Sequence, residues 1–378
     1  MIIHSIVPIN EPLLNGNEEK YLIECIRSGW ISSEGPFVLK FEELMAKSVN
    51  RKYGAAVCNG SVALDLALIS LEIGPGDEVI LPTHTIISCP SAVIRCGAVP
   101  VLVDCNPLTF NMEAKEVEKK ITKKTKAIMV VHIYGLPVDM DPILKLASQH
   151  GLKVIEDAAE MHGQTYRGHP CGKFGDVSTF SFYPNKHVTT GEGGMVLTDD
   201  KTIADKIKYY RNLCFKTEQR FIHDHLGWNY RMSNLQAAVG VAQLERLDQF
   251  VLRKRWMGNM YNSLLSGMNG IQLPLLKTEY AENIFWVYPI VLENSINLTG
   301  RDFMAELAKC GVATRPFFWP IHEQPVFKKI NLFSNEIYPV AEMIARRGFY
   351  VPSGMAITQD QIVYVVNCLK QVINKNCV

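Results

Sequence analysis

The sequence predicts an α/β fold with a mainly parallel central sheet sandwiched by helices, followed by a smaller C-terminal α+β domain. Two observations lead to this prediction. Through the first half of the chain, short and almost continuously apolar segments alternate with helical segments, as in parallel sheets that are covered on both faces. After about residue 250 this alternation stops. Because 378 residues suffice for two domains, we place them at residues 1–249 and 250–378.

The first domain opens with an N-terminal arm and two predicted helices, at residues 18–27 and 38–49, with polar turns between them. A short apolar segment then begins at Gly54 and ends in the turn Asn59-Gly60. Good helix formers with a broad apolar face follow from Ser61. This order indicates a strand, a glycine turn and a helix.

The same alternation continues along the large domain. Strands are predicted at residues 78–81, 99–103, 127–132 and 154–157, with helices at 88–96, 113–121 and 141–150 between them. Two further strands, at 177–183 and 195–198, enclose a polar and glycine-rich loop. Ligands bind parallel sheets of this kind beyond the carboxyl ends of the strands, so we expect the functional site there.

The remainder of the chain is predicted to be mostly helical. Ser233 and Gln236 form a capping box ahead of a helix at 237–247. The second domain is predicted to hold a long helix from 250 to 265, an aromatic strand at 285–291, and helices at 301–310, 340–347 and 358–373. Thr358 and Gln361 give the last helix a capping box of its own.

Composition excludes several classes of function. The balance of 39 basic and 38 acidic residues gives a net charge of +1, which offers no general field for nucleic acid or an anionic membrane. No apolar segment approaches 18 residues, and the N-terminus lacks the basic region of a signal peptide. The ten cysteines form no CxxC pair, so we expect reduced thiols and no metal site. We therefore expect a cytoplasmic protein.

Two polar features stand where predicted strands end. Asn59, Gly60 and Ser61 open a helix, where free backbone N–H groups and the helix dipole favour an anion and the serine hydroxyl adds a donor. The alternative is that Ser61 merely caps the helix. Asp157 ends the apolar strand at 154–157, and a buried carboxylate at that position requires a cationic partner.

A third feature is the loop that runs from Ser181 to Gly194 and carries Lys186, with glycines that let the backbone approach a ligand closely. A single loop lysine is more often a solvated charge. Pyridoxal 5′-phosphate, however, requires all three features: an anion site for its phosphate, a carboxylate opposite its ring nitrogen and a lysine for its aldehyde. Their combination in one domain predicts a site for this cofactor, with Lys186 as the reactive amine.

Six short motifs carry a resemblance to a known family. They are Gly-Trp-Ile-Ser-Ser at 29–33, Asn-Gly-Ser at 59–61, Pro-Gly-Asp-Glu-Val at 75–79, Glu-Asp-Ala-Ala-Glu at 156–160, the loop with Ser-Phe-Tyr, the lysine and Gly-Glu-Gly-Gly at 181–194, and Gly-Trp-Asn-Tyr-Arg-Met at 227–232. With these motifs the chain resembles, over essentially its whole length, the DegT/StrS family of nucleotide-sugar aminotransferases. These are enzymes of the fold type I pyridoxal phosphate class.

The resemblance implies catalytic roles for two residues. Lys186 matches the lysine that forms the Schiff base with the cofactor, and Asp157 matches the partner of the pyridine nitrogen. Glu160 matches the position on the side of the ring hydroxyl.

The resemblance also implies how the phosphate is held. Gly60, Ser61 and Ser181 match the phosphate cradle. Asn229 matches an asparagine that reaches the phosphate of the neighbouring subunit, which implies a homodimer with shared active sites. Without the resemblance, Asn229 would be interpreted as a turn residue before a helix.

One position departs from the family pattern. The family often has an aromatic residue on the cofactor ring in the segment after Pro82, but Ile86 follows Thr85 here. Either Ile86 covers the ring without the aromatic stacking energy of about 0.5–1.5 kcal/mol, or His84 takes that place. The sequence leaves both open.

The segment at 311–322 is the predicted substrate contact. It joins Arg315 to three consecutive aromatic residues, a combination suited to a sugar diphosphate, although core packing beside a surface arginine explains it equally well. The segment is similar to that of family members that aminate 4-keto sugars on a GDP or dTDP carrier. This similarity favours Arg315 as a substrate contact, with Phe317, His322 and His84 nearby.

The implied activity is transfer of the amino group of L-glutamate to C4 of a nucleotide-linked 4-keto-6-deoxyhexose. Other carriers (dTDP or UDP) and a 3-keto sugar stay open as alternatives. One branch of the family has histidine in place of the lysine and dehydrates a 3-hydroxyl, but here His187 only neighbours Lys186. A non-enzymatic regulator that keeps the fold is a further alternative, which the intact lysine and aspartate disfavour.

Overall fold

The computed structural model describes residues 6–377, and the first five residues of the predicted N-terminal arm lie outside it. A central sheet of seven strands organises the large domain, in the order β1-β9-β8-β5-β4-β2-β3. All of its strands run in one direction except β9, which is antiparallel to both neighbours. The predicted mainly parallel sheet is therefore confirmed. The strands are β1 (Tyr53–Val57), β2 (Glu78–Pro82), β3 (Val99–Val103), β4 (Thr125–Val131), β5 (Lys153–Asp157), β8 (Val177–Ser181) and β9 (Gly194–Thr198).

Helices cover both faces of this sheet because successive strand side chains point to opposite sides. In β1, Ala55 and Val57 face one hydrophobic cluster, whereas Ala56 faces the other. The first cluster contains side chains of α3 (Gly60–Ser70), α4 (Ser88–Arg95) and α7 (Lys201–Arg211). The second contains those of α2 (Pro36–Ser48), α5 (Ala114–Glu118), α6 (Met140–His150) and α8 (Asn234–Leu244), and α1 (Glu18–Ser28) packs outside on α8.

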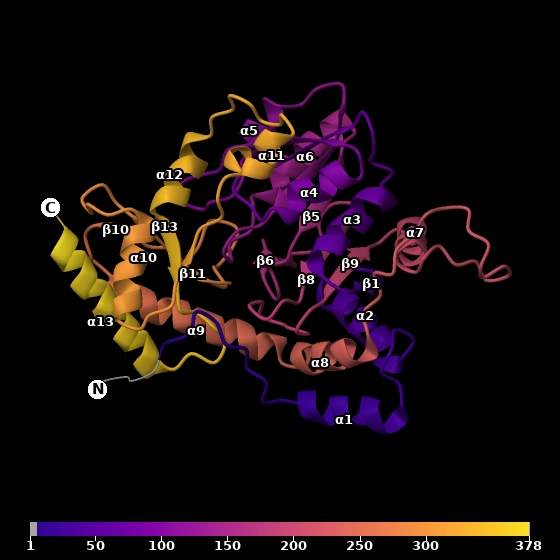
Figure 1. The fold of residues 1–378 in the computed structure, drawn as a ribbon, viewed down its shortest axis with the longest axis horizontal. Helices are drawn as coiled ribbons and strands as arrows, with labels where there is room; N and C mark the ends of the chain where they lie inside the picture. The colour runs from indigo at the N-terminus through magenta and orange to yellow at the C-terminus, as the bar shows by residue number, and fades with distance from the viewer. Residues whose placement is uncertain (1–5, 378) are drawn as a thin grey trace.

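A second, antiparallel sheet forms the small domain and has its own hydrophobic cluster. Its strands follow the order β10 (Ile271–Gln272), β11 (Tyr288–Leu292), β13 (Gly348–Val351) and β12 (Arg315–Pro316). The long helix α9 (Leu247–Leu265) leads from the large domain into it (Figure 1). The predicted boundary at 249/250 falls in the first turn of α9 and stays a prediction. The other helices are α10 (Gly300–Lys309), α11 (Pro325–Lys329), α12 (Pro339–Arg347) and α13 (Gln359–Asn376), with a 3-10 turn at Ile321–Glu323.

The predicted aromatic strand at 285–291 begins later than expected. Phe285 has a φ of 48°, outside the extended conformation of a regular strand, and β11 starts only at Tyr288. The short strands β10, β12 and β13 and the hairpin of β6 (Thr165–Tyr166) and β7 (His169–Pro170) were not predicted. At two to four residues each, they are too short to show a period in the sequence. Within residues 6–377, every helix lacks the length or the apolar character that a membrane crossing requires.

Candidate active site

A cavity of about 370 Å³ lies at the carboxyl ends of β1, β4, β5 and β8. The large domain forms a polar wall, and the small domain contributes an aromatic wall of Trp286, Phe318 and Tyr350. The cavity brings together seven of the residues predicted from the sequence to hold the cofactor: Gly60, Ser61, Ile86, Asp157, Glu160, Ser181 and Lys186.

The first part of the polar wall is a cradle at the beginning of α3. The side chain of Asn59 caps this helix by accepting a hydrogen bond from the Val62 N–H at 3.0 Å. Ser61 is therefore free of the capping role, and its hydroxyl lies 2.8 Å from that of Ser88. A Cβ at Gly60 would lie 2.7 Å from the Cβ of Ser181, so only glycine lets strand β8 approach this turn. The helix dipole, free N–H groups and hydroxyls fit a phosphate.

The second part is Asp157, the last residue of β5. Its side chain is buried and accepts hydrogen bonds from the Ala159 N–H at 3.1 Å and from the Cys89 thiol at 3.4 Å. Burial raises the pKa of this carboxyl group, while the Ala159 N–H, the Cys89 thiol and the charge of Lys186 act in the opposite direction. A cation opposite Asp157 would relieve the cost of its desolvated charge.

The third part is Lys186, whose side chain is only 10% exposed. Its Nζ lies 4.0 Å from Oε1 of Glu160 and 3.8 Å from the centre of the Trp286 ring. Burial lowers the pKa of Lys186, while Glu160 and Asp157 act in the opposite direction. A buried amine with a lowered pKa is the form of lysine that attacks carbonyl groups.

Glu160 completes the polar wall. Its Oε2 accepts a hydrogen bond from the Tyr134 N–H at 2.6 Å. Burial raises the pKa of Glu160 to about 8, against the opposing effects of Lys186 and of the Tyr134 N–H. The wall therefore holds two buried acids but one lysine, and pyridoxal phosphate, with its cationic ring nitrogen, its phosphate and its aldehyde, fits these residues.

Three predicted substrate contacts lie elsewhere. His84, Phe317 and His322 are buried and do not line the cavity. The His84 ring packs among Tyr134, Phe317 and Phe318, and burial lowers its pKa to about 3. The ring nitrogens of His322 lie 2.9 Å from the Thr83 hydroxyl and 3.2 Å from Oε1 of Glu342. Because these side chains serve the packing between the domains, the geometry argues against direct substrate contact for all three.

The geometry bears differently on Ile86, Arg315 and Asn229. Ile86 lines the cavity and is 43% exposed, so of the two residues considered for the cofactor ring it is the better placed. Arg315 is exposed on β12, opposite the cavity residue Tyr350 in the register of the sheet. Asn229 is exposed and does not line the cavity of its own chain.

Sequence reasoning missed several residues of the site. Trp286 and Tyr350 come from segments 100 and 164 residues after Lys186, and their only sequence signal was the aromatic content of their segments. Ser88 and Cys89 begin α4 a few residues after the strand predicted at 78–81, where the expectation that polar residues gather beyond strands could have found them.

A buried hydrogen-bond network around His132 and Glu156 lies next to the cavity. His132, Glu156 and Cys171 lie close enough to hold a metal ion. His132, however, already makes hydrogen bonds with both ring nitrogens, to Oε1 of Glu156 at 3.0 Å and with the Val138 N–H at 3.0 Å. Glu156 also accepts the N–H groups of Gly172 and Phe174. These hydrogen bonds hold Glu156 in place, and Glu156 directly precedes Asp157 in β5.

Comparison with known proteins agrees with this site. Residues 12–370 match the DegT/DnrJ/EryC1/StrS aminotransferase family. The chain is 40% identical over 368 residues to a GDP-perosamine synthase of Caulobacter vibrioides and 39% identical over 365 residues to one of Escherichia coli O157:H7, covering 97% of this chain and 98% of each relative. It is similar to the solved structure of a putative sugar aminotransferase, Spr1654 from Streptococcus pneumoniae, in its PLP form, with a TM-score of 0.92, 25% identity, and coverage of 98% of this chain and 99% of that one.

Fold and site together define a pyridoxal-phosphate-dependent transferase, with a lysine and a carboxylate at the carboxyl edge of a mainly parallel sheet. Within this class, the chain belongs to the DegT/DnrJ/EryC1/StrS aminotransferase family and is a sugar aminotransferase.

Proposed function

We propose that the protein transfers the amino group of L-glutamate to C4 of a GDP-linked 4-keto-6-deoxyhexose. The observation that carries this proposal is the 39–40% identity, over nearly full length, to GDP-perosamine synthases of Escherichia coli and Caulobacter. The alternatives are a dTDP-linked or UDP-linked 4-keto sugar, as in viosamine synthesis, and a 3-keto sugar.

In this proposal, residues of the polar wall hold the cofactor. Gly60, Ser61 and Ser181 cradle its phosphate, Asp157 faces the ring nitrogen and Glu160 the ring hydroxyl. Ile86, which lines the cavity, would cover the ring. Bound pyridoxal phosphate supplies an aldehyde for the Schiff base and an electron sink for the carbon that loses its proton.

Lys186 moves the protons of the reaction. Its Nζ accepts the proton of the α-carbon of L-glutamate, and in the second half-reaction it delivers a proton at C4 of the sugar. The buried surroundings that lower its pKa keep the amine able to accept that proton. Asp157 stays negative, because its two hydrogen-bond donors stabilise the charged form.

The proposal includes a homodimer with shared sites. Asn229 lies in the segment between α7 and α8, which extends away from the body of the molecule (Figure 1). Phe221 and Leu226 in this segment are 79% and 89% exposed. Apolar side chains so exposed favour burial against a second subunit, where Asn229 would reach the neighbouring phosphate. We also propose a cytoplasmic location, where nucleotide sugars are made.

Arg315 is the proposed contact of the sugar diphosphate. It is exposed at the edge of the aromatic wall, and its guanidinium donates to the carbonyl oxygen of Thr314, leaving further donors for a phosphate. The dehydratase alternative is disfavoured, because His187 is buried, with its Nδ1 3.3 Å from the carbonyl oxygen of His162, and does not line the cavity.

A substrate panel tests the proposal. The purified protein is incubated with L-glutamate and with 4-keto-6-deoxyhexoses on GDP, dTDP and UDP carriers, alongside a 3-keto sugar, and aminated products are detected by mass. We expect the GDP-linked 4-keto sugar to have the highest kcat/KM, by at least about tenfold. A preference for another carrier, or for the 3-keto sugar, would contradict the proposed substrate and leave the family assignment intact.

A further inference from the structure

Ser88, the first residue of α4, lines the cavity, but the proposed function gives it no part. Its side-chain oxygen lies 2.8 Å from that of Ser61, within hydrogen-bond distance, and either hydroxyl can be the donor. Among the residues that the structure describes, neither hydroxyl has another hydrogen-bond partner. The pair therefore keeps hydrogen-bonding capacity for a ligand in the cavity.

The number of hydrogens in this pair limits how it can bind a phosphate. A serine hydroxyl has one hydrogen to donate and two lone pairs with which to accept. One hydrogen of the pair lies between the two oxygens, so only the other hydrogen is left for a ligand. The oxygens of an ionised phosphate act as acceptors, so a hydroxyl that binds them has to donate. One serine therefore donates to the phosphate, and the second serine donates to the first.

The surroundings indicate that Ser61 is the serine that meets the phosphate. It lies in the first turn of α3, where free N–H groups and the helix dipole attract an anion. Gly60 beside it packs closely on Ser181, because a Cβ at Gly60 would lie 2.7 Å from the Cβ of Ser181. Ser88 comes from a different helix, and within the described part of the chain its hydroxyl joins this cradle through Ser61 alone. Ser88 is therefore placed to donate to Ser61.

We propose that Ser88 is a positioning residue for the phosphate of pyridoxal phosphate. Its hydroxyl donates to Oγ of Ser61 and so directs the hydrogen of Ser61 toward the phosphate. A serine hydroxyl without such a donor rotates, or bonds to a nearby backbone carbonyl group. The donated hydrogen bond also polarises the Ser61 hydroxyl, which strengthens its own hydrogen bond to the anion. The proposal rests on the phosphate cradle of the proposed function, and it does not depend on which sugar is used.

Cofactor affinity with and without the phosphate tests this role. The cofactor-free protein is titrated with pyridoxal 5′-phosphate and, separately, with pyridoxal, and binding is followed by the absorbance of the bound ligand. Ser88→Ala should weaken binding of pyridoxal 5′-phosphate about fivefold, as for one lost hydrogen bond, and leave binding of pyridoxal within about twofold. Alanine is a good helix former, so α4 should be retained. Ser91→Ala is the matched control, because Ser91 lies on the same helix but does not line the cavity, and it should change neither affinity by more than about twofold.

A double variant tests whether Ser88 acts through Ser61. Ser61→Ala should weaken binding of pyridoxal 5′-phosphate at least about tenfold, because a hydrogen bond to an ionised group is lost. Since Ser88 has no hydroxyl to orient in that background, adding Ser88→Ala should lower the affinity by less than about twofold more. A further fivefold loss in the double variant would mean that Ser88 acts without Ser61, and this result overturns the proposal.

Two other results overturn the proposal. An unchanged affinity of Ser88→Ala for pyridoxal 5′-phosphate would show that Ser61 needs no partner, and an equal loss for both ligands would show that Ser88 supports only the local fold. Failure of the phosphate cradle itself is distinguishable, because Ser61→Ala would then leave the affinity for pyridoxal 5′-phosphate unchanged. Since no sugar takes part in these titrations, failure of the substrate panel and failure here are also distinguishable.

Discussion

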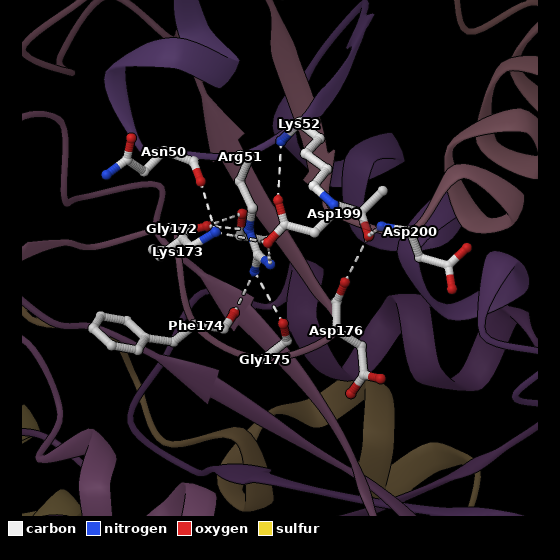
Figure 2. A network of polar contacts seen from close by, with 12 residues as sticks. Asn50, Arg51, Lys52, Gly172, Lys173, Phe174, Gly175, Asp176, Asp199 and Asp200 are labelled. Atoms are coloured by element: carbon white, nitrogen blue, oxygen red, sulfur yellow. Dashed lines mark hydrogen bonds and ion pairs between the residues drawn. The ribbon is translucent and has the colours of Figure 1, made fainter.

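The amino edge and the carboxyl edge of the large sheet, where its parallel strands begin and end, differ in how completely their buried charges are paired. At the amino ends of β1 and β8, Arg51 lies in a network of polar contacts (Figure 2). Its side chain is 3% exposed and donates to the carbonyl oxygens of Gly172 and Gly175 at 2.9 and 3.1 Å, while Asp199 pairs with it at 3.2 Å. Lys173 pairs with the same carboxylate at 2.8 Å. Here both cations lie within ion-pair distance of a carboxylate, although they share Asp199.

At the carboxyl edge the pairing is incomplete. Two acids face one lysine, and Glu160 approaches Lys186 only to 4.0 Å. Among the residues described, both ring nitrogens of buried His84 and the hydroxyl of buried Tyr134 lack hydrogen-bond partners. Unsatisfied polar groups of this kind reduce stability and gather at functional sites.

This difference in pairing indicates that the amino edge of the sheet contributes mainly to stability and the carboxyl edge mainly to function. Glu156 connects the two edges, because it holds His132 beside the cavity and accepts the N–H groups of Gly172 and Phe174 in the segment that Arg51 binds. The ion pairs at the amino edge thus offset the stability that is lost to incomplete pairing at the carboxyl edge. The two edges should therefore respond differently to substitution.

The largest effect on stability is expected from Arg51→Ala. The substitution leaves the carbonyl oxygens of Gly172, Phe174 and Gly175 without their buried donor, while Asp199 keeps its ion pair with Lys173, and this should lower the free energy of unfolding by about 3–5 kcal/mol. Urea unfolding measures this loss, and Lys52→Ala, an exposed neighbour, is the control, expected to change by less than about 0.5 kcal/mol. Turnover by the protein that stays folded should change less than about twofold; a larger loss of turnover would mean that this edge takes part in the chemistry.

Asp157→Asn should have the opposite pattern, with a large loss of activity and little change in stability. Asparagine keeps the shape but has no charge to place opposite the ring nitrogen, so the rate of the half-reaction with L-glutamate should fall on the order of 10²–10³-fold. Stability should change by less than about 1 kcal/mol, because removal of a costly buried charge offsets the loss of one of the two acceptor oxygens. Stopped-flow absorbance and urea unfolding give the two values. A loss of stability as large as that of Arg51→Ala would remove the contrast between the edges.

The smallest of these effects is expected at the aromatic wall. Trp286→Ala removes the ring that lies 3.8 Å from Nζ of Lys186 and should slow the same half-reaction about tenfold, in line with about 1–2 kcal/mol for a desolvated cation–π contact. Trp286→Phe keeps a ring and should stay within about threefold. If Trp286→Ala slows the half-reaction as much as Asp157→Asn does, the aromatic wall contributes as much to catalysis as the polar wall, contrary to this expectation.

The polar wall was predictable because strand ends in a parallel sheet converge. Asp157 and Ser181 end recognisable apolar strands, and Ser61 and Lys186 follow such strands, so their assembly follows from the order of the elements. The aromatic wall was not predictable in this way. Trp286 lines the cavity from an irregular segment in which Phe285 adopts a positive φ, a property that no periodicity reveals.

The predictions for His84, Phe317 and His322 show why the substrate side was harder. Each lies near an exposed or cavity residue in the sequence, yet each side chain turns into the packing between the domains. A mixture of aromatic residues and histidine has the same pattern in a binding segment and in a core. Tertiary packing decides between them, and the sequence contains no local signal for it.

The central claim is that Lys186 is the amine joined to the cofactor, and the chain supplies a second buried lysine to compare. Lys254 is buried, its pKa is lowered to about 7 by burial, and its Nζ donates to the carbonyl oxygen of Trp286 at 2.8 Å. Borohydride reduction of the protein with pyridoxal phosphate bound, followed by peptide mass mapping, fixes the label on the lysine that forms the Schiff base. We predict the label on the peptide that contains Lys186; a label on Lys254, or no label at either position, would contradict the account.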